Sequence, residues 1–544
     1  MERAIFVRLL CALLFGAGIL ALAAGCDTDI SGDPFENQPP DTQLSVRDTS
    51  LVDNLTNAER LSSTVFVSWT GNDPDGFVAA FELRFFNEGF SPAPDADWVR
   101  TTRNDTLVLL PIPRGERDAN VIFEVRAIDN EDARDPQPAR TIFPIKNAPP
   151  SIRFSSFDLP PDTTFHIFSF AWIAEDPEGE TNLDRIEVSF NDSTTFTALP
   201  ADAAFVTFIG ENNRDDPGQT VADAQVFIGR ALQRADITVP GLRLNAENTL
   251  YLRAVDATDT TSTRQDFTWY VKKARSRVLF VNDHRKASFL TVQGYHMSLL
   301  RDFLPPEVDV DVWTVTEPFV TGNVGNVPRS SLLPPNADPT IRRMMAEWEY
   351  LYWISTNTVN AVGGNNLPFM AGTLDLFFDQ GGKMMVHTPV TQPRNPEDNL
   401  GNPAILLLPL SELFIRPDSL QRMELGRGAA VSAVGGLPGV SEPLPDLVSD
   451  NFYINELPYF ARGANTLPLY EADYVYLTRF GNRGSWVSPR TIASISGDRR
   501  IGLFGLPLVN EISGVPLLSG ADGDPDAARR AVQLMLESLG FPKR

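Results

Sequence analysis

Short runs in which apolar and polar residues alternate dominate the first half of the chain. Two of them are residues 64–69 (Thr-Val-Phe-Val-Ser-Trp) and residues 121–126 (Val-Ile-Phe-Glu-Val-Arg). Alternation with a period of two places every second side chain on one face of a strand, so these runs predict half-buried β-strands. Pro, Gly, Asn and Asp separate the runs. This pattern predicts antiparallel β-sandwiches of roughly 100 residues each.

Three blocks of sequence recur in the same order, which indicates two copies of one module. The paired blocks are 37–40 and 147–150, 69–76 and 172–179, and 126–129 and 253–256. The second block opens with Trp69 in one copy and Trp172 in the other. The module resembles fibronectin type III and related immunoglobulin-like domains, a resemblance that implies that both tryptophans fill the core between two sheets. We expect the sandwiches to span residues 42–146 and 147–273.

Carboxylates are concentrated in the loops of both copies, after each tryptophan and after a later strand. Oxygen ligands from two converging loops can hold calcium. Ordinary turn chemistry is the alternative, because proline fixes φ and glycine accepts a positive φ in Asp-Pro-Asp-Gly and Asp-Pro-Glu-Gly. The calcium hypothesis involves seven residues, which are Asp73, Asp75, Asp129, Glu131, Asp176, Glu178 and Asp256.

From about residue 276 the apolar runs become continuous and alternate with helical periodicity. The expected strands are 277–282, 308–313, 350–355 and 383–387, and the expected helices are 288–303, 341–349 and 370–378. A last helix is expected after Asp524, with Pro525 in its first turn. Alternating strands and helices predict a doubly wound parallel α/β domain over residues 276–544. A Pro- and Gly-rich insertion at about residues 390–500 has no predicted regular fold.

This order of strands and helices resembles the class I glutamine amidotransferase-like fold, including the domains appended to envelope lipoproteins. The resemblance implies a cysteine on a sharp turn after a central strand, a glycine-rich oxyanion loop and a late His-x-Glu pair. Residues 386–389 (Val-His-Thr-Pro) contain no cysteine, and residues 502–507 (Gly-Leu-Phe-Gly-Leu-Pro) contain neither His nor Glu. We therefore expect a non-catalytic domain, a pseudoenzyme.

Polar residues follow the expected parallel strands, at the edge where such sheets bind ligands. Ligand binding, metal or acid–base chemistry, and simple hydrogen bonding to nearby loops all fit residues of these types. The sequence has no His-Glu-x-x-His, Gly-x-Ser-x-Gly or P-loop motif that would favour one chemistry. The predicted cleft consists of Asp283, His284, Ser355, Thr356, His387 and Thr388.

The first 25 residues have the three zones of a signal peptide: Arg3 and Arg8, an apolar run over 9–22, and small residues before Cys26. Residues 22–26 (Leu-Ala-Ala-Gly-Cys) resemble a bacterial lipobox, with Ala23 where leucine is common. The resemblance implies that Cys26 is acylated, with residues 26–41 as a tether. Cys11 is the only other cysteine, so the exported chain has one thiol and no internal disulfide. The expected location is the cell envelope, at the outer membrane or the periplasmic face of the inner membrane.

Charge narrows the range of partners. The chain has 46 basic and 70 acidic residues, a net charge of −24, which disfavours nucleic acids and anionic lipid headgroups. We expect a lipid-anchored binding or scaffold protein whose partners are the membrane, through the anchor, and other envelope proteins or glycans. Apart from calcium, no cofactor is expected. The enzyme alternative is an envelope hydrolase acting on glycans or peptides through the strand-end histidines.

Overall fold

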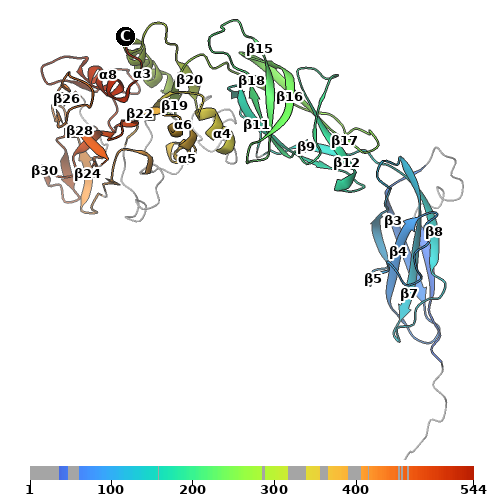
Figure 1. Ribbon diagram of the computed structural model, residues 1–544. Coiled ribbons are helices and arrows are strands. Elements are labelled where there is room, and N and C mark those ends of the chain that lie inside the picture. The colour runs from blue at the N-terminus through green and yellow to red at the C-terminus, as the bar shows by residue number, and fades with distance from the viewer. Residues whose placement is uncertain are drawn as a thin grey trace, which may run out of the picture. The chain divides into compact units, whose positions relative to one another are not determined.

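The structure is a computed structural model of two compact units, residues 1–148 and 149–544 (Figure 1). It describes residues 36–46, 60–156, 158–284, 288–315, 338–355, 366–389, 406–414, 416–450, 454, 457–461 and 465–544. The expected signal peptide, Cys26 and most of the tether lie outside the described residues. Among the described helices, none is both long enough and apolar enough to cross a membrane.

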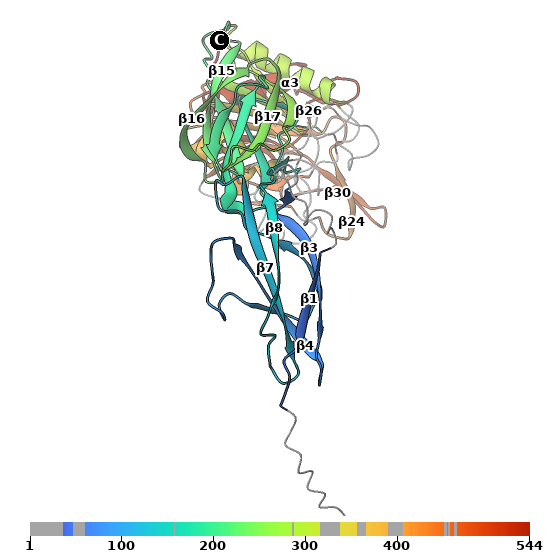
Figure 2. The same ribbon diagram turned by 90° about the vertical axis from the view of Figure 1, so that its right-hand side faces the viewer.

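The first unit is a β-sandwich. One sheet has the order β1 (Asp41–Val46), β3 (Thr64–Asn72), β6 (Asp105–Leu109). The other has the order β2 (Leu61–Ser62), β8 (Ala139–Lys146), β7 (Asp118–Asp129), β4 (Val78–Asn87), β5 (Val99–Thr101), and Figure 2 shows β7 and β8 side by side. Buried Trp69 lies between the sheets, with its ring centroid 6.2 Å from that of Phe123. The predicted sandwich and the core position of Trp69 are confirmed.

The second sandwich opens the second unit. One sheet has the order β10 (Thr163–Thr164), β18 (Gln265–Val271), β17 (Ala246–Asp256), β12 (Leu183–Phe190), β13 (Thr197–Pro200). The facing sheet has the order β16 (Gln233–Arg243), β15 (Val221–Ile228), β14 (Phe205–Gly210), β11 (Ile167–Glu175), β9 (Ser151–Phe154). Trp172 is buried in this core, together with Trp269 and Phe170. The second predicted sandwich is confirmed as well.

The sequence repeat encodes the same turn twice. The carboxylate of Asp129 accepts hydrogen bonds from the backbone N–H groups of Glu131 and Ala133, both at 2.8 Å. Asp256 accepts from Thr258 and Thr260 at 2.8 and 2.9 Å in the same way. These aspartates are buried, so the repeated Arg-Ala-x-Asp block ends each long strand with an aspartate that satisfies the following turn.

The glycines of the two Asp-Pro-x-Gly turns have different roles. Gly179 has φ 109°, the positive value expected from the sequence. Gly76 is not among the positive-φ residues, which corrects the expectation for the first copy. A Cβ at Gly76 would lie 2.2 Å from Asn130 Oδ1 and 2.6 Å from Asp73 Oδ2. Gly76 is therefore needed because two loops approach closely there.

The rest of the second unit is built on a 12-stranded mixed sheet. Its parallel part has the order β20 (Asp311–Thr314), β19 (Val278–Asn282), β21 (Tyr350–Ile354), β22 (Lys383–His387), β32 (Ile501–Phe504). Helices α3 (Phe289–Phe303) and α8 (Ala527–Leu539) cover one face of these strands. The other face is covered by α4 (Asp338–Met345), α5 (Leu367–Ala371) and α6 (Asp375–Asp379) (Figure 1). This two-sided cover explains why these strands are apolar at consecutive positions.

The structure shows strands where none were predicted and corrects the start of one helix. In the described part of the insertion at about 390–500, the sheet continues in antiparallel pairs through β31 (Thr491–Ser496), β28 (Thr466–Ala472), β25 (Ala430–Ala433) and β26 (Leu447–Ser449), and β33 (Leu518–Gly520) ends it. Its other strands are β23 (Glu412–Leu413), β24 (Leu420–Glu424), β27 (Tyr459–Phe460), β29 (Val475–Thr478) and β30 (Arg483–Ser485). The last helix begins at Ala527, and its N-cap is Asp526, two residues later than the sequence indicates. Asp524 lies in the turn before the helix, where its carboxylate accepts a hydrogen bond from the Asp526 N–H.

The second sandwich packs directly on the helices of the α/β part. The rings of Phe165 and Trp348 meet edge to face with centroids 4.8 Å apart. Beside them, His166 Nε2 lies 3.5 Å from Glu347 Oε2. Burial by itself raises the pKa of Glu347, but the hydrogen bond from His166 and the charges around it, including Arg343 and Arg214, outweigh it and leave the pKa lowered. Aromatic and ionic contacts together hold this boundary.

Candidate functional site at the carboxyl edge of the parallel strands

The register of the parallel strands aligns their carboxyl ends. Asn282 pairs with Ile354, Ile354 with His387, and His387 with Phe504. Residues that follow these positions therefore lie along one edge of the sheet. Among them, Ser355 donates its backbone N–H to the His387 carbonyl at 2.8 Å. Thr356, which the sequence places in the same cleft, is outside the described residues.

Three ring side chains from three elements meet below this edge. His296 on α3 and Tyr352 on β21 share a 2.8 Å hydrogen bond between Nδ1 and the phenol oxygen. The ring centroid of His387 on β22 lies 4.8 Å from that of His296 and 5.0 Å from that of Tyr352. All three side chains are buried. A polar cluster thus sits within a largely apolar core.

Burial determines the charge of this cluster. It lowers the pKa of His296 to about 3, with a smaller effect from Arg529 in the same direction. It also lowers the pKa of His387 well below its usual value, and His296 adds to that effect. Burial likewise raises the pKa of Tyr352. Because both imidazoles are neutral at pH 7, each carries one N–H donor and one acceptor nitrogen.

His387 has no hydrogen-bond partner for either ring nitrogen among the described residues. A buried polar group left in this state costs about 1–3 kcal/mol. The side chain lines a pocket of about 200 Å³ together with His296, Ser355, Thr388 and Glu511. Apolar walls surround these groups and consist of Val292, Ile354, Leu506, Leu508, Val509 and Leu517. The His387 side chain therefore borders a space that another molecule can enter, while each of its ring nitrogens exposes less than 1 Å².

Asp283 and His284, the other described residues of the predicted cleft, do not line this pocket. The carboxylate of Asp283 accepts from the backbone N–H and the side-chain amide of Asn366, at 2.5 and 2.6 Å. His284 Nε2 is 2.9 Å from the Ser288 hydroxyl and 3.7 Å from Glu511 Oε2. Both Asp283 and His284 are fully buried. The structure thus brings Ser355, His387 and Thr388 together around the pocket and turns Asp283 and His284 towards neighbouring segments.

The predicted cleft did not include His296, Tyr352 or Glu511. A signal for His296 exists in the sequence, because it lies four residues after Val292 and three before Leu299 on the apolar face of α3. A polar residue on such a face requires a partner, which Tyr352 provides. Glu511 has no such signal, since only the path of the chain after β32 brings it to the pocket.

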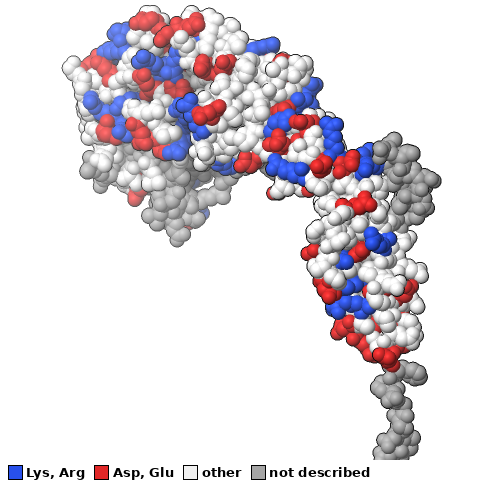
Figure 3. Space-filling view, turned by 45° about the vertical axis from the view of Figure 1, so that its right-hand side comes forward, with Lys and Arg blue, Asp and Glu red and all other residues white. Residues whose placement is uncertain are grey.

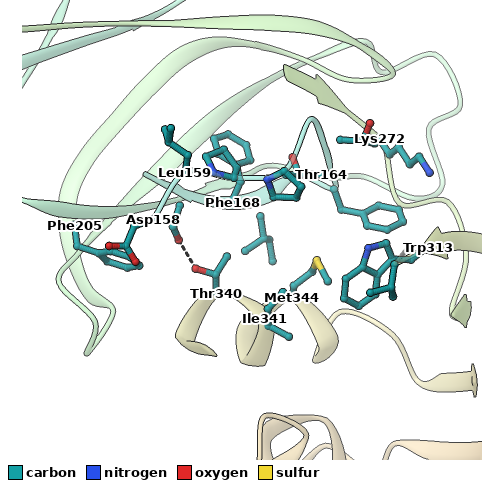
Figure 4. A pocket seen from close by; sticks show the side chains of 17 residues that line it. Asp158, Leu159, Thr164, Phe168, Phe205, Lys272, Trp313, Thr340, Ile341 and Met344 are labelled. Carbon is teal, nitrogen blue, oxygen red and sulfur yellow. Dashed lines mark hydrogen bonds between the residues drawn. The ribbon is translucent and has the colours of Figure 1, made fainter. Parts of the chain in front are cut away.

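A second pocket lies where the second sandwich meets α4 and β20 (Figure 4). It is about 60 Å³ in volume and mostly apolar, with Phe168, Trp313 and Met344 among the side chains drawn. Its polar groups have partners: Ser169 and Thr340 share a hydrogen bond, drawn as a dashed line, and Asp158 pairs with Arg230 at 2.8 Å. None of the described residues that line this pocket carries a buried polar atom without a partner, unlike His387.

Four of the seven acidic residues of the calcium hypothesis accept backbone N–H groups in turns. Besides the two aspartates described above, Asp176 Oδ1 accepts from the Glu178 N–H at 2.8 Å, and Asp73 Oδ1 from the Asp75 N–H at 3.4 Å. In the described part of the chain no three His, Cys, Asp or Glu residues are grouped so that they could hold a metal ion. In Asp73 and Asp176 only one carboxylate oxygen, Oδ1, accepts such a turn N–H.

Charged side chains on the face shown in Figure 3 are mixed, with acidic and basic groups interspersed. Two ion pairs recur in the sandwiches: in the first Arg126 Nη2 lies 2.7 Å from Glu82 Oε2, and in the second Arg253 Nη2 lies 2.6 Å from Glu187 Oε2. These two pairs occupy equivalent strands, β4 with β7 and β12 with β17. No large patch of one sign appears on that face.

No protein-family model matches the chain, and no curated protein matches it. Solved structures similar to it include the fibronectin(III)-like modules of Clostridium thermocellum CbhA, at 11% identity and TM-score 0.16, covering 43% of this chain and 96% of that one. The FN1–FN3 domains of chicken CNTN1 match at 8% identity and TM-score 0.15, covering 39% of this chain and 64% of that one. The selenomethionine-substituted chicken interferon gamma receptor alpha chain matches at 10% identity and TM-score 0.20, covering 43% of this chain and 98% of that one. TM-scores this low carry no weight, so the sandwich assignment depends on the strand pairing and the buried cores.

Proposed function

We propose that the protein is a lipid-anchored component of the bacterial cell envelope that binds a small molecule at the pocket of His387 without transforming it. One observation carries the binding proposal: a buried imidazole, with no partner among the described residues for either nitrogen, borders a pocket at the carboxyl edge of parallel strands. Ligands bind at this edge in open α/β sheets. A ligand that pairs with His387 would remove the energetic cost of its isolation.

The same site is poorly suited to acid–base catalysis. A general acid or base works best with a pKa near the operating pH. Burial moves the pKa of His296 to about 3 and that of His387 well below its usual value, so neither exchanges protons readily at pH 7. The Ser355 hydroxyl donates to the Asp283 carbonyl at 3.2 Å. These properties favour hydrogen bonding to a ligand over proton transfer.

The hydrolase alternative has one specific contact in its favour, the 2.9 Å hydrogen bond between Ser288 and His284. In a Ser-His-acid triad the serine and the acid address opposite nitrogens of the imidazole. Here Glu511 approaches Nε2, the nitrogen that also faces Ser288. His284 is fully buried and lies outside the pocket lining. Binding without turnover therefore remains the better supported function.

Two further parts of the proposal come from resemblance. The class I glutamine amidotransferase-like fold would make the α/β part a pseudoenzyme, with Val386-His387-Thr388 where that family carries its nucleophile. The two sandwiches would then act as spacers or as adhesive modules towards envelope proteins or glycans. The lipobox-like residues 22–26 support the anchor at Cys26.

Native mass spectrometry of the full-length protein purified from its own membranes tests the binding function. We expect an added mass from a bound small molecule in the wild type and its loss in His387→Leu. His166→Gln, a buried histidine outside the pocket, is the matched control and should retain the mass. Turnover of a glycan or peptide that His284→Ala abolishes in a folded protein would favour the hydrolase instead.

Membrane fractionation tests the anchor separately. Mass spectrometry of the mature N-terminus should show acyl chains on Cys26, and Cys26→Ser should move the protein to the aqueous fraction. An unmodified N-terminus would contradict the anchor without affecting the pocket.

A further inference from the structure

The pocket of His387 has an unusual charge balance for a site with so many polar groups. Among the described residues that line it, Glu511 is the only one with a formal charge at pH 7, and none is Lys or Arg. His296 and His387 are neutral there because they are buried. An anion entering this pocket would meet no opposite charge.

Arg529 of α8, the basic side chain whose charge acts on His296, is directed elsewhere. Its guanidinium lies over the ring of Tyr295, 5.4 Å from the centroid. It forms an ion pair with Asp302 and lies 3.8 Å from Asp526, and it donates to the Ser298 hydroxyl at 2.9 Å. These partners keep Arg529 outside the pocket lining, so it cannot neutralise a bound anion directly.

We propose that this pocket selects an uncharged, compact ligand with an amide or alcohol group next to a branched apolar portion, and that it excludes carboxylates and other anions. The proposal rests on the proposed binding function and adds the chemical class of the ligand. The apolar portion would contact Val292, Leu506 and Leu508, and the polar group would face His387.

Hydrogen-bonding chemistry favours a neutral group at His387. A neutral imidazole offers a donor at one nitrogen and an acceptor at the other, and an amide or hydroxyl can pair with either. An anion can only accept, and it loses its hydration in a site with no counter-charge, which is costly. A cation can only donate hydrogen bonds, so it would use only the acceptor nitrogen of His387. The one charge in the lining that could attract a cation is that of Glu511, whose carboxylate already lies 3.7 Å from His284 Nε2.

Three molecules of nearly the same shape test this selection: isobutyramide, isobutyrate and isobutyramidinium, which carry no charge, a negative charge and a positive charge. Each is titrated into the full-length protein while the ring nitrogen resonances of the histidines are followed by NMR at pH 7. We expect isobutyramide to shift the His387 resonances and to bind at least about tenfold more tightly than either ion, a difference of about 1.4 kcal/mol.

Variants separate the pocket from its selectivity. His387→Leu should abolish the isobutyramide response, and Glu511→Arg, checked for folding by near-ultraviolet circular dichroism, should invert the preference towards isobutyrate. Tighter binding of isobutyrate or isobutyramidinium to the wild type would overturn the ligand class while leaving the binding function intact. If none of the three shifts His387, the binding function and the ligand class both fail.

Discussion

His296 and His387 face each other in the core of the α/β part with their ring centroids 4.8 Å apart. One comes from helix α3 and the other from the end of strand β22, and Tyr352 binds only the first. The pair stays neutral because a charge on either ring would be buried without a counter-ion. Such an arrangement makes the stability of the domain depend on pH and leaves His387 available to another molecule.

The stability of the α/β part should fall as the pH drops from about 6.5 to about 3. The ordinary pKa of histidine is 6.5 and burial lowers that of His296 to about 3, so the unfolded chain binds more protons in this window. The contribution is complete above the unfolded value and decreases by about 1.4 kcal/mol per pH unit for each such histidine. Hydrogen exchange of β22 and α3 against pH measures it. A flat profile would contradict the neutral pair.

Replacing His387 by leucine should stabilise the protein. The substitution removes two nitrogens that have no partner among the described residues, and it adds apolar contact. Together these effects should raise the free energy of unfolding by about 1 kcal/mol. His296→Leu is the matched control and should destabilise by about 1–3 kcal/mol, because it leaves the Tyr352 hydroxyl buried without its partner. Urea unfolding followed by hydrogen exchange of β21 and β22 compares the two. Destabilisation by both variants to the same extent would show that His387 has a structural role.

The periodicity of the sequence was sufficient to predict both sandwiches and the parallel strands, because a strand's burial pattern is local. Trp69 and Trp172 could be placed in cores for the same reason. The boundaries were less accurate: the strand expected over 308–313 is β20, Asp311–Thr314. No fold could be predicted for the insertion, because its strands, such as Ala430–Ala433, are short and pair with segments distant in sequence.

The candidate site was only partly predictable. His387 and Ser355 follow apolar runs, which a sequence shows, and their place at one edge follows from parallel pairing. The direction of a side chain beyond the strand end depends on loops, and for that reason Asp283 turned towards Asn366 instead of the pocket. The repeated cross-strand pairs were missed too, since neither Glu82 nor Glu187 falls in a conspicuous motif.

Glu82→Gln should weaken the first sandwich. Burial alone raises the pKa of Glu82, but hydrogen bonds from Arg126 and Arg134 outweigh it and leave the pKa lowered. Removing this charge leaves Arg126 with only Asp95, 3.7 Å away, as an ionic partner, so we expect a loss of about 1–3 kcal/mol. Faster hydrogen exchange in β4 and β7 of the full chain is the expected result. Glu116→Gln, at an exposed position, should leave exchange unchanged.

Calcium and EDTA should both leave the melting temperature of the sandwiches unchanged. The buried Asp129 carboxylate also accepts from Asn37 at 2.6 Å, so one oxygen binds a side chain and the other binds turn N–H groups. Asp256 is committed to its turn in the same way. Differential scanning calorimetry with excess calcium provides the measurement. An upward shift that Asp73→Asn or Asp176→Asn removes would instead establish a metal site in the turns.

Two glycine substitutions in the α/β part should act in opposite directions. A Cβ at Gly502 on β32 would lie 2.9 Å from Met385 Sδ and 3.2 Å from Leu539 Cδ1, so Gly502→Val forces α8 away from the sheet and costs about 1–3 kcal/mol. Gly294 on α3 has open space around its Cβ position, and Gly294→Ala should stabilise by about 1 kcal/mol through helix propensity. Urea unfolding of both variants, followed by hydrogen exchange of α8 and α3, measures whether each substitution raises or lowers the free energy of unfolding. If Gly502→Val were tolerated without loss, the close packing of α8 on β32 would be refuted.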